Sequence, residues 1–104
     1  MLRLLLPCLL LFPAVADAEA KKGVVALNRS GCDYYIVETV LGYSLLEWYG
    51  GNNPDKGDVI VGDIESYGMK DIFNITDDRE GRVWVEDYWL GRDEVLRKYV
   101  EKCN

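Results

Sequence analysis

The stretch from Cys32 to Tyr49, CDYYIVETVLGYSLLEWY, decides the fold of this chain. Its first half, Cys32 to Val40, is rich in β-branched and aromatic residues, which favour strands. Leu41 and Gly42 form a turn, and Tyr43 to Tyr49 supplies a second apolar and aromatic run. We therefore predict two neighbouring strands that are joined closely enough to make a hairpin.

Further strands are expected on both sides of this hairpin, where short apolar runs alternate with turn-forming segments. The runs are Val24 to Leu27, Asp58 to Ile64, Met69 to Thr76 and Arg82 to Leu90. The clearest loop is 50–57, and 77–81 has the composition of a charged turn. In the third run, the alternation of side chains places the apolar face on the side of Phe73 and Ile75.

The periodicity changes near the end of the chain. From Arg92 to Asn104 the apolar residues recur at intervals of three and four, as on one face of a helix. These residues are Val95, Leu96, Tyr99, Val100 and Cys103. Asp93 and Glu94 lie in the first turn and Lys98 and Lys102 toward the end, as the helix dipole prefers. We predict a C-terminal helix with Cys103 on its apolar stripe.

Five or six short antiparallel strands followed by one helix predict a mainly β fold. It would be a small barrel or a strongly bent sheet, with the helix closing one end or one face. The segment Gly57-Asp58-Val59-Ile60-Val61-Gly62-Asp63-Ile64, continued to Tyr67 and Gly68, resembles strand–turn–strand segments of SH3-like and OB-like barrels. This resemblance implies architecture alone, because such folds carry many functions.

The first twenty residues have the layout of a secretory signal peptide. Arg3 gives a positive start, Leu4 to Phe12 form an apolar run, and Ala16, Ala18 and Ala20 offer two overlapping cleavage sites. The run is well short of the roughly 20 residues that span a bilayer. We expect cleavage after Ala18 or Ala20 and no stable membrane insertion afterwards. A single small domain, 21–104, would then fold in the periplasm or outside the cell.

The cysteines fit this exported location. Cys8 lies inside the expected signal peptide, whereas Cys32 and Cys103 remain in the domain. Two cysteines in a small secreted domain most often form one disulfide, and no C-x-x-C motif marks them as a redox pair. We predict a disulfide between Cys32 and Cys103 that pins the helix onto the first long strand.

Catalysis and metal binding have little support in the sequence. Histidine is absent, which excludes Ser-His-Asp and Cys-His nucleophiles and the usual zinc sites that contain histidine. We expect no catalytic residue, no metal and no cofactor. The acidic clusters Asn53, Asp55, Asp58 and Asp77, Asp78, Glu80 are interpreted as ordinary turns rather than calcium loops. A hydrolase that uses carboxylates such as Glu38 and Glu47 is the remaining catalytic alternative.

Charge and aromatic content point to a binding role. A net charge of −6 lacks the basic footprint of a nucleic-acid binder and would favour a basic partner. A small barrel cannot bury all of its rings inside, so some must reach the surface. The best surface candidates are Trp48 and Tyr49 beside the glycine loop, and Tyr88 and Trp89 before the helix.

Two binding functions remain open at this point. The first is a non-catalytic module that binds another envelope or extracellular protein, one form of which is an inhibitor of a basic secreted enzyme. The alternative is a carbohydrate or small-ligand binder that stacks Trp48, Trp84 or Trp89 on sugar rings.

Overall fold

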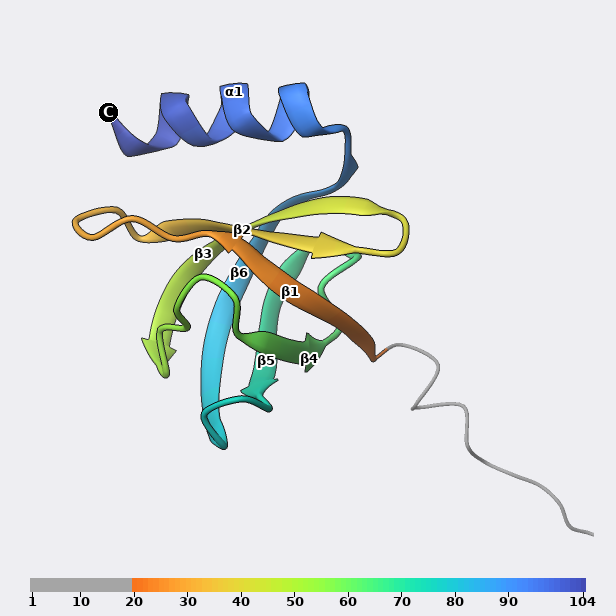
Figure 1. Ribbon diagram of the computed structural model, residues 1–104, viewed down its shortest axis with the longest axis vertical. Helices are drawn as coiled ribbons and strands as arrows, with labels where there is room; N and C mark the ends of the chain where they lie inside the picture. The colour runs from red at the N-terminus through yellow and green to blue at the C-terminus, as the bar shows by residue number, and fades with distance from the viewer. Residues whose placement is uncertain (1–19) are drawn as a thin grey trace, which may run out of the picture.

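The computed structural model describes residues 20–104, which form a barrel of strands covered on one side by a helix (Figure 1). The elements are β1 (Lys21–Leu27), β2 (Tyr34–Thr39), β3 (Gly42–Gly51), β4 (Val59–Gly62), β5 (Gly68–Asn74), β6 (Arg79–Leu90) and α1 (Arg92–Cys103). The predicted mainly β fold with a C-terminal helix is confirmed. The predicted signal peptide lies outside the described residues, apart from Ala20.

The strands close into a ring in the order β1-β2-β3-β6-β5-β4, and every neighbouring pair is antiparallel. The ring closes where β1 pairs with β4, from Lys21 opposite Gly62 to Val24 opposite Val59. β3 and β6 are the longest strands, and they lie side by side. Of the two expected architectures, the closed barrel is therefore the right one.

Strands β2 and β3 bury both of their faces, which explains their nearly continuous apolar sequence. Successive side chains of a strand point to opposite faces. Tyr35 and Leu46 therefore point into the barrel, whereas Ile36 and Leu45 point outward and pack under α1 with Val95. The residues 20–104 thus form two apolar clusters, one inside the barrel and one between the barrel and the helix.

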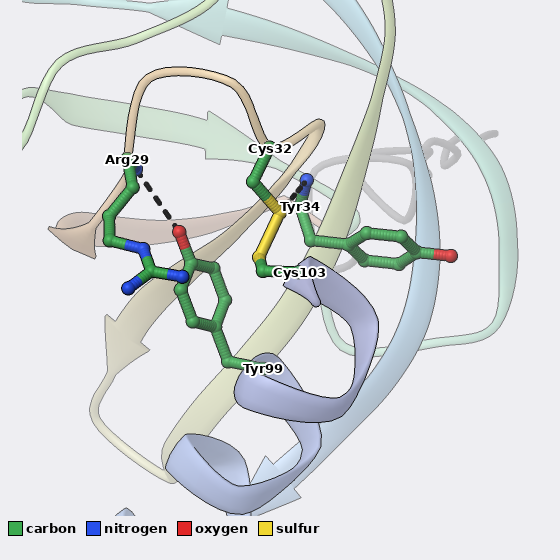
Figure 2. Close-up of a disulfide and its surroundings, with 5 residues drawn as sticks. All are labelled: Arg29, Cys32, Tyr34, Tyr99 and Cys103. Carbon is green, nitrogen blue, oxygen red and sulfur yellow. Dashed lines mark hydrogen bonds between the residues drawn. A yellow bond between two sulfur atoms is a disulfide. The ribbon is translucent and has the colours of Figure 1, made fainter.

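Helix α1 lies across the outer face of β2 and β3, and its far end is fastened to the loop before β2 (Figure 2). The predicted disulfide between Cys32 and Cys103 is present, with the two Cα atoms 5.4 Å apart. The hydroxyl of Tyr99 accepts a hydrogen bond from the backbone N–H of Arg29 at 3.1 Å. The Arg29 guanidinium also lies over the Tyr99 ring, 5.5 Å from its centre.

The apolar face predicted for β5 is wrong. The structure buries Ile72 and Asn74 and leaves Ile75 45% exposed, while Phe73 is half-buried. The inward position of Asn74 is maintained by hydrogen bonds from its side-chain amide to Asn52 and Asp58, which lie in a distant loop. These contacts satisfy a polar group inside the fold, so apolar alternation alone does not determine which face is buried.

The charged turn predicted at 77–81 is shorter in the structure. β6 begins at Arg79, and Glu80 and Gly81 already pair with Phe73 and Ile72 of β5. Arg79 and Glu80 are both exposed, and charged side chains on the solvent side of a strand carry no burial cost. The turn itself is made at Asp78, whose φ of 57° is left-handed.

Candidate functional site

The four aromatic residues predicted to bind a partner lie at two separate places on the β3–β6 pair. Trp48 is opposite Val83, near the β5–β6 turn, and Tyr49 follows it in β3. Tyr88 and Trp89 occupy the other end of β6, where Leu90 pairs with Tyr43. The structure therefore does not gather these four rings on a single surface.

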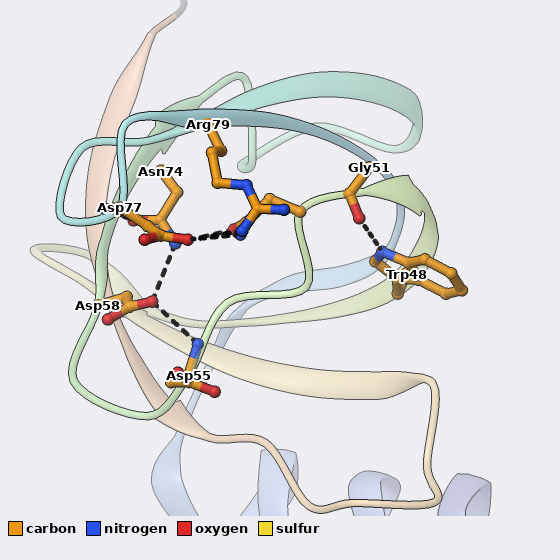
Figure 3. A network of polar contacts seen from close by, with 8 residues as sticks. Trp48, Gly51, Asp55, Asp58, Asn74, Asp77 and Arg79 are labelled. Atoms are coloured by element: carbon orange, nitrogen blue, oxygen red, sulfur yellow. Dashed lines mark hydrogen bonds and ion pairs between the residues drawn. The ribbon is translucent and has the colours of Figure 1, made fainter.

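Trp48 has a structural role in the barrel. Its ring is half-buried and packs against the apolar cluster inside the barrel. Its indole N–H donates a hydrogen bond to the carbonyl oxygen of Gly51 at 3.1 Å, which is drawn in Figure 3. Tyr49 differs from Trp48, because 53% of its surface is exposed.

Tyr88 and Trp89 belong to an aromatic cluster that also includes Tyr67. The ring centres of Tyr67 and Tyr88 are 4.8 Å apart, and those of Tyr88 and Trp89 are 5.1 Å apart and nearly perpendicular. Tyr88 is half-buried against the barrel, whereas Tyr67 and Trp89 are 62% and 60% exposed. Tyr67 was not among the residues predicted to bind a partner, because its contact with Tyr88 depends on how β5 pairs with β6.

The contact between the adjacent rings of Tyr88 and Trp89 depends on an unusual backbone conformation. Neighbouring side chains of a regular strand point to opposite faces, so their rings do not normally touch. Trp89 has a φ of 58°, in the left-handed region that large residues rarely adopt. Rotation about that bond turns Trp89 toward Tyr88. Bulky residues in this region carry backbone strain of about 1–3 kcal/mol.

The turn between β2 and β3 lies beside this aromatic cluster. A side-chain carbon added to Gly42 would lie 3.3 Å from the Cα of Trp89, so the two backbones are in close contact. The hydroxyl of Thr39 donates to the carboxylate of Glu65 at 2.6 Å, which fastens this turn to the β4–β5 connection. Exposed apolar side chains of both elements therefore lie at the same end of the barrel, and together they are here called the hairpin-end surface. It consists of Val40, Leu41, Tyr67 and Trp89.

A fixed carboxylate lies next to the rings of the hairpin-end surface. Asp87 accepts hydrogen bonds from the Tyr67 hydroxyl at 3.3 Å and from the backbone N–H of Tyr88 at 2.9 Å. Lys98 of α1 lies 3.5 Å from its other oxygen. The negative charge of Asp87 raises the pKa of Tyr67. A negative group and exposed rings therefore lie together at this end of the barrel.

The acidic turns weighed as calcium ligands hold two loops together (Figure 3). The buried amide of Asn74 donates to Asn52 at 2.8 Å and to Asp58 at 2.9 Å. Asp77 accepts from Asn52 at 3.2 Å and lies 3.3 Å from Arg79. Within residues 20–104, no three carboxylate or cysteine groups are arranged to hold a metal ion.

The carboxylates considered for a hydrolase lie apart. Glu47 is opposite Tyr34, whereas Glu38 is opposite Tyr43, four positions further along the hairpin. That spacing corresponds to about 13 Å along a strand, which is wider than the roughly 5–9.5 Å between the paired carboxylates of glycosidases. Glu47 acts on Tyr34 instead: burial first, and then this neighbouring negative charge, raise the pKa of Tyr34 to about 12.

Comparison with known proteins gives no significant match to a family model, to a curated protein or to a solved structure. Within residues 20–104, no helix is long and apolar enough to cross a membrane. The functional assignment therefore rests on the residues and surfaces of the chain itself.

Proposed function

We propose that this protein is a non-catalytic interaction module that binds another protein through the hairpin-end surface. One observation carries the proposal: the members of this surface are apolar or aromatic, lie at the same end of the barrel, and are at least 60% exposed. Val40 reaches 97% and Tyr67 62%, while Leu41 and Trp89 are both at 60%. Groups of exposed apolar side chains mark interaction sites in soluble proteins, and aromatic residues are enriched among interface anchors.

The backbone strain at Trp89 supports the same surface. A left-handed tryptophan in a strand costs stability that an ordinary residue would not. Strained conformations of this kind cluster at functional sites, where the surrounding structure keeps them in place. In this conformation the exposed indole of Trp89 contacts the ring of Tyr88. That arrangement suits an anchor residue at the centre of an interface.

The site of action that we propose is the periplasm or the extracellular space. A disulfide between Cys32 and Cys103 is compatible with an exported protein, because disulfides persist in oxidising compartments and are rare in the cytosol. The expected signal peptide at 1–20 points the same way. The partner would then be another envelope or secreted protein.

The charge of the chain favours a basic partner. The net charge of −6 belongs to the chain as a whole. At the hairpin-end surface, Asp87 lies beside Lys98, and Glu65 lines a hollow together with Lys21 and Lys22. Complementary charge speeds the encounter of two proteins and loses its effect as salt screens it. An inhibitor of a basic secreted enzyme is one form that this function can take.

Partner capture tests the proposal. The disulfide-bonded protein is immobilised and exposed to the envelope and secreted fractions of its source at low and at moderate salt, and the bound proteins are identified by mass spectrometry. We expect one enriched protein that is lost with Trp89→Ala and weakened by salt. The matched control is Tyr49→Ala, which removes an exposed ring elsewhere on the barrel and should retain the partner.

Two outcomes would contradict the proposal. One is that no protein is enriched even at low salt. The other is that the enriched protein binds the Trp89→Ala variant as well as it binds the unmodified chain. Either outcome would favour the alternative function, carbohydrate binding. The residues that could bind a carbohydrate lie on a different face of the barrel.

A further inference from the structure

A second surface with a distinct chemistry lies on the outer face of β3, β6 and β5. In the register of these strands, Trp84 of β6 lies between Glu47 and Met69, and Arg82 lies between Gly50 and Asp71. Residues two apart in a strand share a face, so Arg82 and Trp84 point to the same side. Trp84 is 38% exposed, and Tyr49 on the neighbouring strand is 53% exposed.

An open trough of about 290 Å³ runs beside Tyr49 on this face. Its lining includes Gly50, Gly51 and Gly81, and its polar residues are Asp71, Arg82 and Glu80. At Gly50 the backbone is uncovered, because a side-chain carbon there would meet nothing within 4 Å. A side-chain carbon at Gly81 would lie 2.7 Å from the carbonyl oxygen of Asn52, so close packing of two backbone segments requires glycine there. The trough is therefore lined by close-packed backbone at the glycines and by the exposed side chains of Tyr49, Asp71, Glu80 and Arg82.

The residues around the trough combine a ring face with paired hydrogen-bonding groups. The Nε of Arg82 donates to the carboxylate of Asp71 at 2.9 Å, and both side chains are more than half exposed. Together they offer carboxylate acceptors and guanidinium donors within one pair. The charges of Asp71 and Arg82 compensate each other, and Glu80 adds one negative charge to the lining, which disfavours an anionic ligand. The neighbouring phenol ring of Tyr49 offers a flat apolar face.

We propose that this trough binds one neutral pyranose unit of an oligosaccharide. The C–H face of the sugar ring would stack on Tyr49, and its hydroxyl groups would donate to Asp71 and accept from Arg82. The volume of the trough lies just below the roughly 300–1,000 Å³ range of ligand pockets, which limits it to one small ring. Because the trough is open, the glycan chain can continue along the face toward Trp84.

The test is a titration of the disulfide-bonded, ¹⁵N-labelled protein with maltohexaose, cellohexaose and chitohexaose in turn. We expect at least one of these neutral hexasaccharides to shift the amide signals of Tyr49, Gly50, Gly81 and Arg82 in a saturable way. Tyr49→Ala should weaken binding roughly five- to tenfold, as the loss of a ring contact predicts. Tyr49→Trp should retain it, because it preserves a stacking face.

Two further variants keep the test decisive. Asp71→Asn removes an exposed carboxylate without touching either apolar cluster, so it should fold normally and weaken sugar binding. Trp89→Ala alters the hairpin-end surface and should leave sugar binding unchanged. The proposal is overturned if none of the three sugars gives saturable shifts at millimolar concentration. It is also overturned if the shifts map away from the trough, or if Tyr49→Ala and Asp71→Asn both bind as tightly as the unmodified protein.

Discussion

Trp84 and Trp89 lie five positions apart on β6 and are both exposed, yet their backbones differ. Trp89 has a positive φ and Trp84 does not. An alanine in an ordinary strand is more stable than glycine by roughly 0.5–1 kcal/mol, because glycine loses more freedom on folding. At a left-handed position the order reverses, because glycine alone adopts positive φ without a steric cost.

This difference gives a prediction at the residue scale. Trp89→Gly should be more stable than Trp89→Ala by about 1 kcal/mol, since both variants lose the ring and only alanine retains the strain. The corresponding pair at Trp84 is the control and should show the opposite order. Urea unfolding monitored by circular dichroism measures all four variants. If alanine is the more stable residue at position 89 as well, the strain assigned to Trp89 is absent.

Tyr35 gives a second prediction. Its hydroxyl is fully buried in the barrel and has no hydrogen-bond partner among residues 20–104. An unsatisfied buried polar group costs roughly 1–3 kcal/mol. We therefore expect Tyr35→Phe to stabilise the protein by about 1 kcal/mol at neutral pH. A higher denaturant midpoint at an unchanged m-value would show this gain. A loss of stability would mean that the hydroxyl has a hydrogen-bond partner.

The same residue predicts how stability changes at alkaline pH. Burial raises the pKa of Tyr35 far above its ordinary value of 10.0. The unfolded chain therefore releases this proton at a lower pH than the folded protein does. The contribution of Tyr35 to the free energy of unfolding is therefore fully present below pH 10 and decreases as the pH rises above that value. Tyr34, whose pKa is raised to about 12, adds to the loss. Tyr35→Phe should make the fall shallower, and an unchanged pH profile would contradict the assignment.

At the scale of elements, α1 depends on its attachments. The helix begins after Gly91 without a side-chain cap, and its N-terminal turn gains no hydrogen bond from one. Its stability comes from Val95 and Tyr99, which are buried against β2 and β3, and from the disulfide at Cys103. Two positive residues, Lys98 and Lys102, add exposed ion pairs that contribute little on their own.

Removal of the disulfide should therefore act first on the helix. The bond closes a loop of 71 residues, and loss of such a bond costs roughly 2–4 kcal/mol. For the double variant Cys32→Ser and Cys103→Ser we expect a stability loss in that range. The amides of α1 should then exchange with deuterium at a lower free energy than those of β3 and β6. Equal exchange in helix and strands would show that the helix and the barrel open as one unit.

The elements were predictable from the sequence because their periodicities are local. Three- and four-residue spacing identified α1, and the long run of β-branched and aromatic residues identified β2. The buried face of β5 was not predictable, because Met69, Phe73 and Ile75 outnumber Ile72 in the local pattern. Contacts of Asn74 with a loop far away in sequence decide which face is buried.

The candidate sites were predictable only in part, for a related reason. Tyr49 and Trp89 stand out in the sequence because a small barrel cannot bury every ring. Their separation onto two surfaces follows from the β3–β6 register, which one sequence does not reveal. Tyr67 and the β2–β3 turn join the hairpin-end surface only once the barrel has closed. The trough depends on backbone packing at Gly81, which carries no side-chain signal.

At the scale of the whole molecule, acidic residues outnumber basic ones, so negative charge remains after every possible ion pair has formed. The net charge is −6, and three of the ion pairs, Arg79–Asp77, Arg82–Asp71 and Arg97–Glu101, have both side chains at least half exposed. Exposed pairs are worth about 0–1 kcal/mol each, whereas excess charge of one sign destabilises a compact state through self-repulsion. We expect the melting temperature to rise from low to moderate sodium chloride. A fall would mean that the ion pairs contribute more than the repulsion costs.

The closed order of the strands has a consequence for how copies of this protein meet. Each strand from β1 to β6 has a hydrogen-bonded neighbour on both sides. Sheets with an unpaired edge recruit strands from other chains and grow into aggregates. No strand of residues 20–104 has an edge that is open along its whole length, which disfavours strand addition between copies. Any growth into fibrils must begin from chains that have opened.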